Sequence, residues 1–496
     1  MDKDIRKIND IMVDIFSLVE LLEEESVKGS SFENLSLKEV HTLVAVGSGR
    51  PKTMTNGATT LGISVSTLTT AVNKLVKKGY MERFRDENDK RIVRLSLTEN
   101  GRTVIRKHEE YHDQVVGEAL RRLSKNERNR LERVLTEIER FLMLKAAGSE
   151  RRTQLMMEPL TIGAHTLPVP IVQAGMGIGI AGENLASAVA INGGLGLIAL
   201  TDIGFDEPDF DANPVAANKR AIRKKVSAAI AKVRDAGGSG LIGVNIIWNK
   251  EHAREYLDEA IRGGAQVVVT NSGMPRNLPK YCTDKKVALI PTVSTRRAAN
   301  TIVEAWSRNY NRTPDAFILQ SPTAAGLLGY RDEQLDTAIK EWQMTISELR
   351  GVANKIGGCP LIVGGGIITK NDADKVYRCG ADGFLLGSRF VTTEECDAPD
   401  EYKMLHLGCS AEDVITVNSP MNGVVRVMRN KFSEHLAETG SRDYDIFKAV
   451  RAGVGGDYEN GLIFCGSNPE KLNRIDRVAD VFEEFTGLRQ QSAVNR

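Results

Sequence analysis

The sequence predicts a multidomain protein in which an α+β winged helix-turn-helix domain precedes an α/β (β/α)8 barrel of the TIM type. Two patterns support this prediction. In the first part of the chain, helices joined by a tight turn precede a β-hairpin pattern, whereas in the second part eight short apolar runs alternate with helical stretches. The change falls at a small, charged stretch, KAAGSERR at 145–152, which suits a linker. We therefore expect domains at 1–145 and 158–490, joined by a linker over 146–157.

The composition is typical of a soluble, cytoplasmic globular protein. The 496 residues are 41% apolar and 26% charged, and the formal net charge is +1. The first ten residues are highly charged and no apolar run follows them, so no secretory signal is expected, and no apolar stretch is long enough to span a membrane. All six cysteines lie in the second half and form no CxxC pair, so we expect reduced thiols and no metal site.

The first segments of the chain have helical periodicity. Residues 5–28 carry apolar side chains at helical spacing. Ser36 followed by Glu39 predicts a capping box at the start of a second helix.

Residues 52–80 predict a helix, a turn at Gly62 and a second helix. The second helix has an apolar face that we expect to be buried, formed by Leu68, Val72, Leu75 and Val76. Its opposite face is polar and nearly uncharged, and it suits the major groove of double-stranded DNA. We predict that these side chains contact DNA: Ser64, Ser66, Thr67, Thr69, Thr70, Asn73 and Lys74.

Residues 81–98 alternate around a charged turn at 86–89, which predicts a hairpin. The stretch from Arg50 to Arg94 holds ten Lys and Arg against four Asp and Glu, a surplus typical of a nucleic-acid footprint. The alternative is a solvated hairpin in an ordinary small domain, but its position after a helix-turn-helix favours a DNA-binding wing. The predicted contacts from this hairpin are Arg83, Arg85, Lys90 and Arg91.

This first part resembles the MarR-type winged-helix repressors, and among them the FabT type. The resemblance lies in the helix at 67–80, the wing strand RIVRLSLT at 91–98, and His108 and His112 of the next helix. It implies a homodimer formed by the first and last helices, with transcription regulation in fatty-acid biosynthesis and an acyl-carrier-protein-linked effector. An apolar stripe over 116–142 independently favours dimer formation.

Eight apolar runs in the second part predict the strands of a barrel, after a short hairpin near 160–167. The runs are Ile171, 195–200, 241–247, 266–270, 287–291, 316–320, 360–364 and 383–387. A GxGxxG pattern at 177–182 with Asp202 twenty residues later could instead indicate a dinucleotide-binding fold. We favour the barrel because the glycine-rich turns GGGI at 364–367 and GSRF at 387–390 follow its last two strands, where phosphate sites of barrels lie.

The second part resembles the nitronate monooxygenase family, which includes flavin-dependent enoyl-acyl-carrier-protein reductases of the FabK type. The matching motifs are QAGM at 173–176, GVN at 243–245, the two glycine-rich turns and NGLIFCG at 460–466. The resemblance implies bound FMN, with NAD(P)H as a further expected electron donor. It places Gln173, Gly175, Met176 and Asn245 near the flavin ring. It assigns the phosphate to Gly364, Gly365, Gly366, Gly387 and Ser388. A segment at 419–432 resembles one that closes over the site in some members.

One departure affects the expected chemistry. The family usually has a catalytic histidine after strand six, and Leu327 stands there. Leucine cannot transfer a proton, and such assistance typically contributes about 10²–10⁴ in rate. Weak substitutes are Ser321, Tyr330 and His252. Two hypotheses therefore remain: an FMN-dependent oxidoreductase or monooxygenase fused to a regulator, or a repressor whose barrel senses flavin or an acyl ligand without catalysis.

Overall fold

The structure is a computed structural model that describes residues 3–28, 34–47, 52–61, 63–85, 93–132, 134–135, 138 and 155–487. The chain forms two compact units. The first comprises Met1–Glu139 with Asn354–Gly358, and the second comprises Arg140–Ala353 with Cys359–Arg496. Within the described ranges, no helix combines the length and apolar character that a bilayer crossing requires. The predicted linker lies mostly outside the described residues, and so do the predicted turns at Gly62 and at 86–89.

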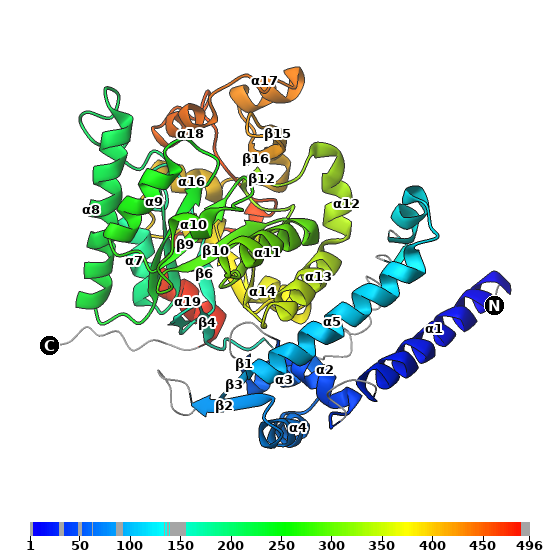
Figure 1. Ribbon diagram of the computed structural model, residues 1–496. Coiled ribbons are helices and arrows are strands. Elements are labelled where there is room, and N and C mark those ends of the chain that lie inside the picture. The colour runs from blue at the N-terminus through cyan, green and yellow to red at the C-terminus, as the bar shows by residue number, and fades with distance from the viewer. Residues whose placement is uncertain are drawn as a thin grey trace. The chain divides into compact units, whose positions relative to one another are not determined.

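The first unit has the order of elements that a winged helix requires (Figure 1). The elements are α1 (Lys3–Lys28), α2 (Leu37–Val46), β1 (Lys52–Thr53), α3 (Met54–Leu61), α4 (Val65–Lys77), β2 (Met81–Arg85), β3 (Val93–Leu97) and α5 (Glu99–Leu120). The strands β2 and β3 pair antiparallel, and β1 adds to the other edge of β3. The hairpin prediction is therefore confirmed for the described residues. The predicted capping box is also present, because Ser36 Oγ accepts from the Glu39 N–H at 3.3 Å and Glu39 Oε2 accepts from the Ser36 N–H at 2.8 Å.

The core of this unit lies between α2, α4 and the hairpin. Leu43, Leu68, Leu75 and Leu95 are fully buried there. One sequence prediction is wrong: Val76 remains 38% exposed. It lies at the border of the apolar stripe, one helical position past Leu75, and the core does not reach it.

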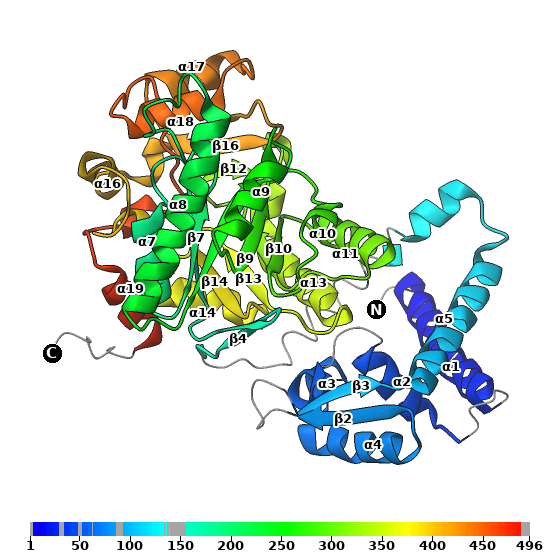
Figure 2. The same ribbon diagram turned by 60° about the vertical axis from the view of Figure 1, so that its left-hand side comes forward.

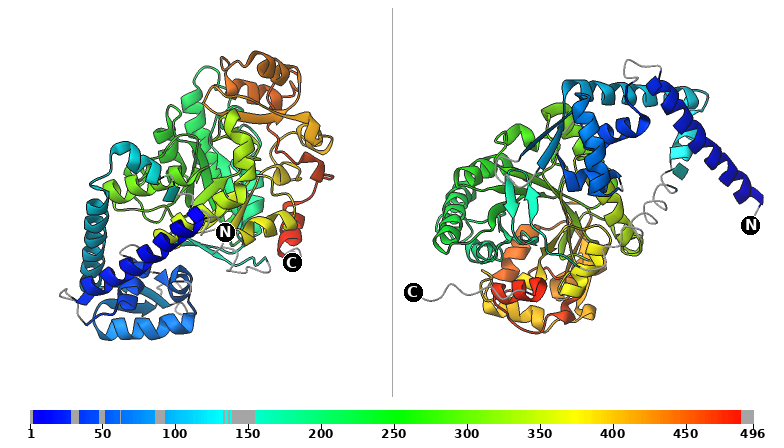
Figure 3. Two further views of the ribbon diagram at one scale, coloured as in Figure 1. Left: turned by 90° about the vertical axis from the view of Figure 1, so that its right-hand side faces the viewer. Right: turned by 90° about the horizontal axis from the view of Figure 1, so that it is seen from below.

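Helix α1, the dark blue helix at the N-terminus in Figure 3, exposes apolar side chains along most of its length. Its exposed apolar side chains are Ile8, Ile11, Val13, Ile15, Phe16, Leu18, Val19, Leu21 and Leu22. Val116, Val134 and Leu135 are also more than half exposed. Patches of this size on a single chain are typical of interaction surfaces.

The second unit contains a closed barrel of eight parallel strands (Figures 1 and 2). The strands are β6 (Ile171–Gln173), β7 (Leu195–Ala199), β8 (Leu241–Ile247), β9 (Val267–Asn271), β10 (Ala288–Val293), β11 (Phe317–Gln320), β13 (Leu361–Gly364) and β14 (Gly383–Leu386). Each falls on one of the eight predicted apolar runs. Because β6 pairs with both β7 and β14, the sheet closes, and the open sheet of a dinucleotide-binding fold is excluded.

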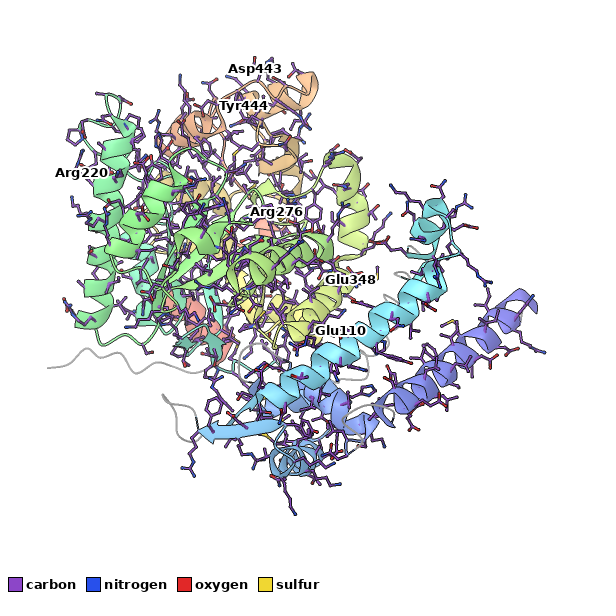
Figure 4. The ribbon with its side chains drawn as sticks, in the orientation of Figure 1. Glu110, Arg220, Arg276, Glu348, Asp443 and Tyr444 are labelled. Carbon is purple, nitrogen blue, oxygen red and sulfur yellow. The ribbon has the colours of Figure 1, made fainter. Side chains whose placement is uncertain are left out.

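Helices surround the barrel on its outside. They are α7 (Glu183–Ile191), α8 (Pro214–Asp235), α9 (Ala253–Arg262), α10 (Leu278–Tyr281), α11 (Arg296–Tyr310), α12 (Leu335–Lys340), α13 (Trp342–Lys355), α14 (Lys370–Arg378) and α15 (Ser388–Val391). Figure 4 labels Arg220 on α8, where it forms surface ion pairs with Asp209 and Glu207. The interior is filled by apolar side chains of the strands, among them Leu197, Val269 and Ile318.

Further elements extend both ends of the barrel. The antiparallel pair β4 (Leu160–Ile162) and β5 (His165–Leu167) precedes the first strand, as predicted. A small sheet in the order β12–β16–β15 follows from β12 (Gly326–Leu328), β15 (Val414–Asn418) and β16 (Val424–Met428). The later helices are α16 (Asp400–Leu407), α17 (Lys431–Thr439), α18 (Ile446–Val454) and α19 (Val478–Thr486). Tyr444, labelled in Figure 4, fixes the segment before α18 because its hydroxyl donates to the Asn418 carbonyl at 2.8 Å.

Candidate functional site

A cavity opens at the carboxyl ends of the barrel strands, the end where barrels of this type hold their ligands. It encloses about 1540 Å³, including the part that is open to solvent. All eight strands contribute residues to the lining of the cavity, either from the strand itself or from just after it. The lining runs from Ala174 after β6 to Leu385 on β14. The lining is mostly apolar with a few amides and hydroxyls, a composition that is typical of a small-molecule or cofactor pocket.

The outer wall of the cavity comes from the chain after the eighth strand. Helix α18 contributes apolar side chains, and a loop before α19 contributes the rest of the wall. These residues are Ile446, Phe447, Val450, Phe464, Gly466, Ser467, Asn468 and Pro469. The sequence motif at 460–466 indicated the loop, but no sequence pattern had indicated α18.

Eight of the nine predicted cofactor residues line this cavity. They are Gly175, Met176, Asn245, Gly364, Gly365, Gly366, Gly387 and Ser388. Gln173 is the exception, since it is fully buried and does not belong to the lining. Its Oε1 accepts from the Leu197 N–H at 2.9 Å and its Nε2 donates to the Ala174 carbonyl, so the carboxamide ties β6 to β7.

Two of the lining glycines are required by the fold itself. Gly365 has φ +107° and Gly366 has φ +73°, a region that other residues rarely adopt. A Cβ at Gly365 would lie 2.7 Å from Ser321 Cβ and 2.8 Å from Ala324 Cβ. The backbone conformation and the packing of the protein thus explain both glycines, and neither glycine by itself indicates a ligand.

Gly387 and Gly466 differ from those two. A Cβ at Gly387 would meet only Ala174 Cβ at 3.7 Å and Met176 Sδ at 4.0 Å. A Cβ at Gly466 would lie 3.4 Å from Ser388 Oγ, at ordinary contact. The fold thus leaves room for a methyl group at both positions, on the cavity wall, where a bare backbone allows close approach of a ligand.

The polar groups of the cavity are amides and hydroxyls. Asn245 donates from Nδ2 to Asn271 Oδ1 at 3.0 Å, which fixes the orientation of both side chains. Gln320 donates from Nε2 to the Leu327 carbonyl at 2.7 Å. Among the described residues that line the cavity there is no Asp, Glu, His, Lys, Arg or Cys. Tyr402 is the ionisable one, and burial raises the pKa of its hydroxyl far above the ordinary value.

Leu327, at the position where the resemblance leads us to expect a histidine, lines the cavity, whereas the three weak catalytic candidates do not. Ser321 Oγ lies 2.7 Å from Thr323 Oγ1 and accepts from the Thr323 N–H at 3.1 Å. Tyr330 is buried and its hydroxyl lies 3.0 Å from the Ser294 carbonyl, and burial raises its pKa. His252 precedes α9, with Nδ1 2.8 Å from Glu255 Oε1. Their role as a base therefore stays a prediction.

The predicted DNA-reading residues of α4 are exposed, except Thr69, which is partly exposed. Several hydroxyls already bond within the helix. Ser64 caps it by accepting from the Thr67 N–H at 3.1 Å, and Thr69 donates to the Val65 carbonyl at 2.7 Å. Thr70 likewise donates to the Ser66 carbonyl at 3.3 Å. Asn73 and Lys74 are exposed one turn further along.

On the hairpin, Arg83 and Arg85 are exposed on β2. Lys90 and Arg91 lie outside the described residues, so the DNA contacts expected of them stay predictions.

Comparisons with known proteins match two different families to the two parts of the chain. Residues 158–487 match the Nitronate monooxygenase family, and residues 35–93 match the MarR family. Over 283 residues the chain is 28% identical to the (3aS,4S,5R,7aS)-5-hydroxy-7a-methyl-1-oxo-octahydro-1H-indene-4-carboxyl-CoA dehydrogenase of Mycobacterium tuberculosis, covering 57% of this chain and 69% of that protein.

Two further similarities concern the two units separately. The structure of FabK from Thermotoga maritima covers 64% of this chain and 91% of its own chain, with 23% identity and a TM-score of 0.51, a likeness of fold. The HTH-type transcriptional regulator YpoP of Bacillus subtilis is 34% identical over 73 residues, which is 15% of this chain and about half, 52%, of the regulator.

Proposed function

The chain belongs to the nitronate monooxygenase family, and from this premise we propose that it is an FMN-dependent oxidoreductase joined to a MarR-type DNA-binding domain. The observation that supports the cofactor best is the pair Gly387 and Gly466. Both line the cavity, and at neither position would a Cβ lie closer than 3.4 Å to another atom. Where backbone without a side chain faces a cavity, a phosphate can come close enough to accept hydrogen bonds from main-chain N–H groups.

Bound in this cavity, FMN would supply the transfer of a hydride or of electrons. The residues of the chain would then bind and orient it. Gly387, Ser388 and Gly466 form one wall at which the phosphate would be held. Asn245, fixed by Asn271, presents an amide whose direction is set before any ligand arrives. Such preorganised groups lower the cost of binding.

The chemistry that this lining permits is restricted. Because the described lining contains no side chain with an ordinary pKa near neutrality, no residue of the cavity can give or take a proton at a useful rate. Apolar side chains of Phe447, Ile446 and Leu327 form part of the lining. We therefore propose an uncharged, apolar substrate group, such as the acyl or ring part of a thioester, with NAD(P)H as the electron donor. The name of the Mycobacterium protein, a carboxyl-CoA dehydrogenase, supports a thioester substrate.

One observation favours a second function. Leu327 fills the position where the resemblance leads us to expect the histidine, and none of the candidate substitutes lines the cavity. A barrel that keeps its flavin without turnover would serve as a sensor for the DNA-binding domain. In both cases we propose that the protein acts as a homodimer on double-stranded DNA, through α4 and the basic hairpin.

An anaerobic visible spectrum of the purified protein, reconstituted with FMN, tests the proposal. We expect the flavin bands of a tightly bound cofactor and their bleaching by NADH or NADPH, followed by reoxidation with an enoyl thioester. Bleaching by an alkyl nitronate instead would change the substrate class. A yellow protein that none of these reagents bleaches would favour the sensor, and a protein that does not retain FMN would refute both.

A further inference from the structure

Four side chains that can bind metals converge in the first unit, away from α4 and the hairpin. Glu23 lies near the end of α1, His41 lies on α2, and His108 and His112 lie on α5. The two α5 histidines are four residues apart and therefore share one face of the helix. Residues distant in the sequence thus meet at one point between three helices.

The distances between these groups are short. Glu23 Oε2 lies 3.3 Å from His41 Nε2, and Glu23 Oε1 lies 2.9 Å from His112 Nε2. The rings of His108 and His112 are 4.5 Å apart, edge to face. Ligand atoms of Glu23, His41 and His108 all lie within 4.8 Å of one another. Glu23 is buried and the three histidines are partly buried.

An ordinary ion pair does not require this arrangement. A carboxylate is balanced by one cation, whereas three imidazoles surround Glu23 here. Neutral imidazoles each offer a nitrogen lone pair, and the carboxylate adds a single negative charge. Three nitrogens and one oxygen are the donors that a divalent transition-metal ion takes, while Mg²⁺ and Ca²⁺ prefer oxygen ligands.

We propose that Glu23, His41, His108 and His112 form a binding site for a divalent transition-metal ion, with Zn²⁺ as the best match. Four protein ligands of this kind make a closed tetrahedral site, which is structural or regulatory rather than catalytic. The sequence had led us to expect no metal site, because that expectation was drawn from the cysteines, none of which lies in this unit.

The site would control how α1 is held. The other contacts of α1 with this unit include Val27, which packs on the core, and the Leu22 carbonyl, which accepts from the Tyr111 hydroxyl at 3.1 Å. A metal ion bound by Glu23 would fasten the same end of α1 to both α2 and α5. If the exposed face of α1 forms the dimer contact, the ion sets the spacing of two α4 helices on DNA. Zn²⁺ is then an effector of DNA binding, independent of the barrel cavity.

Cobalt binding to the metal-free, full-length protein tests the site. Co²⁺ in a four-coordinate site gives strong visible absorption, and Zn²⁺ should displace it and abolish the bands. We expect one Co²⁺ per chain. The variants Glu23→Gln and His108→Gln should weaken binding by more than the ~10–100-fold that loss of an outer-shell partner costs.

Matched controls separate the site from general effects. Glu110→Gln removes an exposed carboxylate from α5, where Figure 4 labels it, half a turn away from the His108 face. His435→Gln removes an exposed histidine from α17. Both controls should bind Co²⁺ as the parent does. Absence of the bands in the parent protein would overturn the proposal whatever the variants do, and equal binding by all variants would overturn the ligand assignment.

A DNA titration tests the effector role. Zn²⁺ should change the affinity of the parent for its operator relative to a chelator, and it should have no effect on His108→Gln. The same affinity of the parent with Zn²⁺ and with chelator would overturn that role.

Discussion

Replacing Gly387 with alanine tests whether this glycine is needed for binding the phosphate of FMN or for packing within the protein. The new methyl group would stand 3.7 Å from Ala174 Cβ and 4.0 Å from Met176 Sδ, at ordinary contact distances. Because the added methyl group makes only these ordinary contacts, the free energy of unfolding of the apoprotein should change by about 1 kcal/mol. The methyl group would instead occupy the space into which we place the phosphate.

The expected loss of FMN affinity follows from the bonds that are displaced. A hydrogen bond to a charged group contributes about 1.5–3 kcal/mol. Loss of one such bond from the phosphate corresponds to a dissociation constant about 10- to 150-fold higher. Apoprotein titrated with FMN, with quenching of flavin fluorescence as the signal, measures this constant, and calorimetric unfolding without FMN measures stability.

Two further variants make the result interpretable. Gly408→Ala, at the end of α16, is the matched control, because its Cβ would approach only the Met404 carbonyl at 4.0 Å and Gly408 does not line the cavity. Gly365→Ala is expected to abolish FMN binding by disturbing the barrel, since its Cβ would lie 2.7 Å from Ser321 Cβ. A Gly387→Ala protein that binds FMN as tightly as the parent would refute the placement of the phosphate at Gly387.

Four other variants test the remaining conclusions. The rate at which the enoyl thioester reoxidises the reduced flavin should be nearly independent of pH in the parent, and Leu327→His should introduce a titration near pH ~6.5 in stopped-flow profiles. A steep pH dependence in the parent would contradict the uncharged lining. Replacing Arg83 and Arg85 together with alanine should reduce the slope of log affinity against log salt by about 0.9 for each DNA phosphate that the protein no longer neutralises, measured by fluorescence anisotropy; an unchanged slope would argue against the hairpin. Phe16→Glu, at a side chain that is 60% exposed on α1, should convert the dimer to a monomer in light scattering, and the parent mass would exclude α1 from the interface. The pKa of Asp372 is lowered because its ion pair with Lys471 and its capping bonds outweigh burial, so its contribution to stability is present at neutral pH and is lost as acid protonates it. In Asp372→Asn the free energy of unfolding should therefore fall less steeply as the pH decreases below neutrality. The same fall in both proteins would contradict this assignment.

The local signals in the sequence were sufficient for the elements of the fold. Apolar runs identified all eight barrel strands, seven of them through runs of five to seven residues, because strands buried on both faces carry no polar alternation. Ser36 and Glu39 identified a helix start because both halves of a capping box lie within one turn. Such signals act over a few residues, and tertiary structure rarely overrides them.

The site was predicted less completely, because its composition depends on contacts between distant segments. Gln173 and Gly175 are two residues apart, yet only the glycine reaches the cavity. Asn271, which orients Asn245, is the last residue of β9, a strand with no motif of its own. The Glu23 cluster joins residues almost ninety positions apart, and only the spacing of His108 and His112 was visible in the sequence.

The wall formed by α18 and the loop before α19 has a consequence for how the protein matures. A ribosome completes the DNA-binding unit first, and domains generally fold in that order. The eight barrel strands are finished at Leu386, but Phe447 and Phe464 are added only near the end of synthesis. If the cavity holds the FMN that we propose, the chain can enclose it only after Phe464 has been made, near the end of synthesis. The proposed DNA-binding domain would then be complete before the barrel could take up its cofactor.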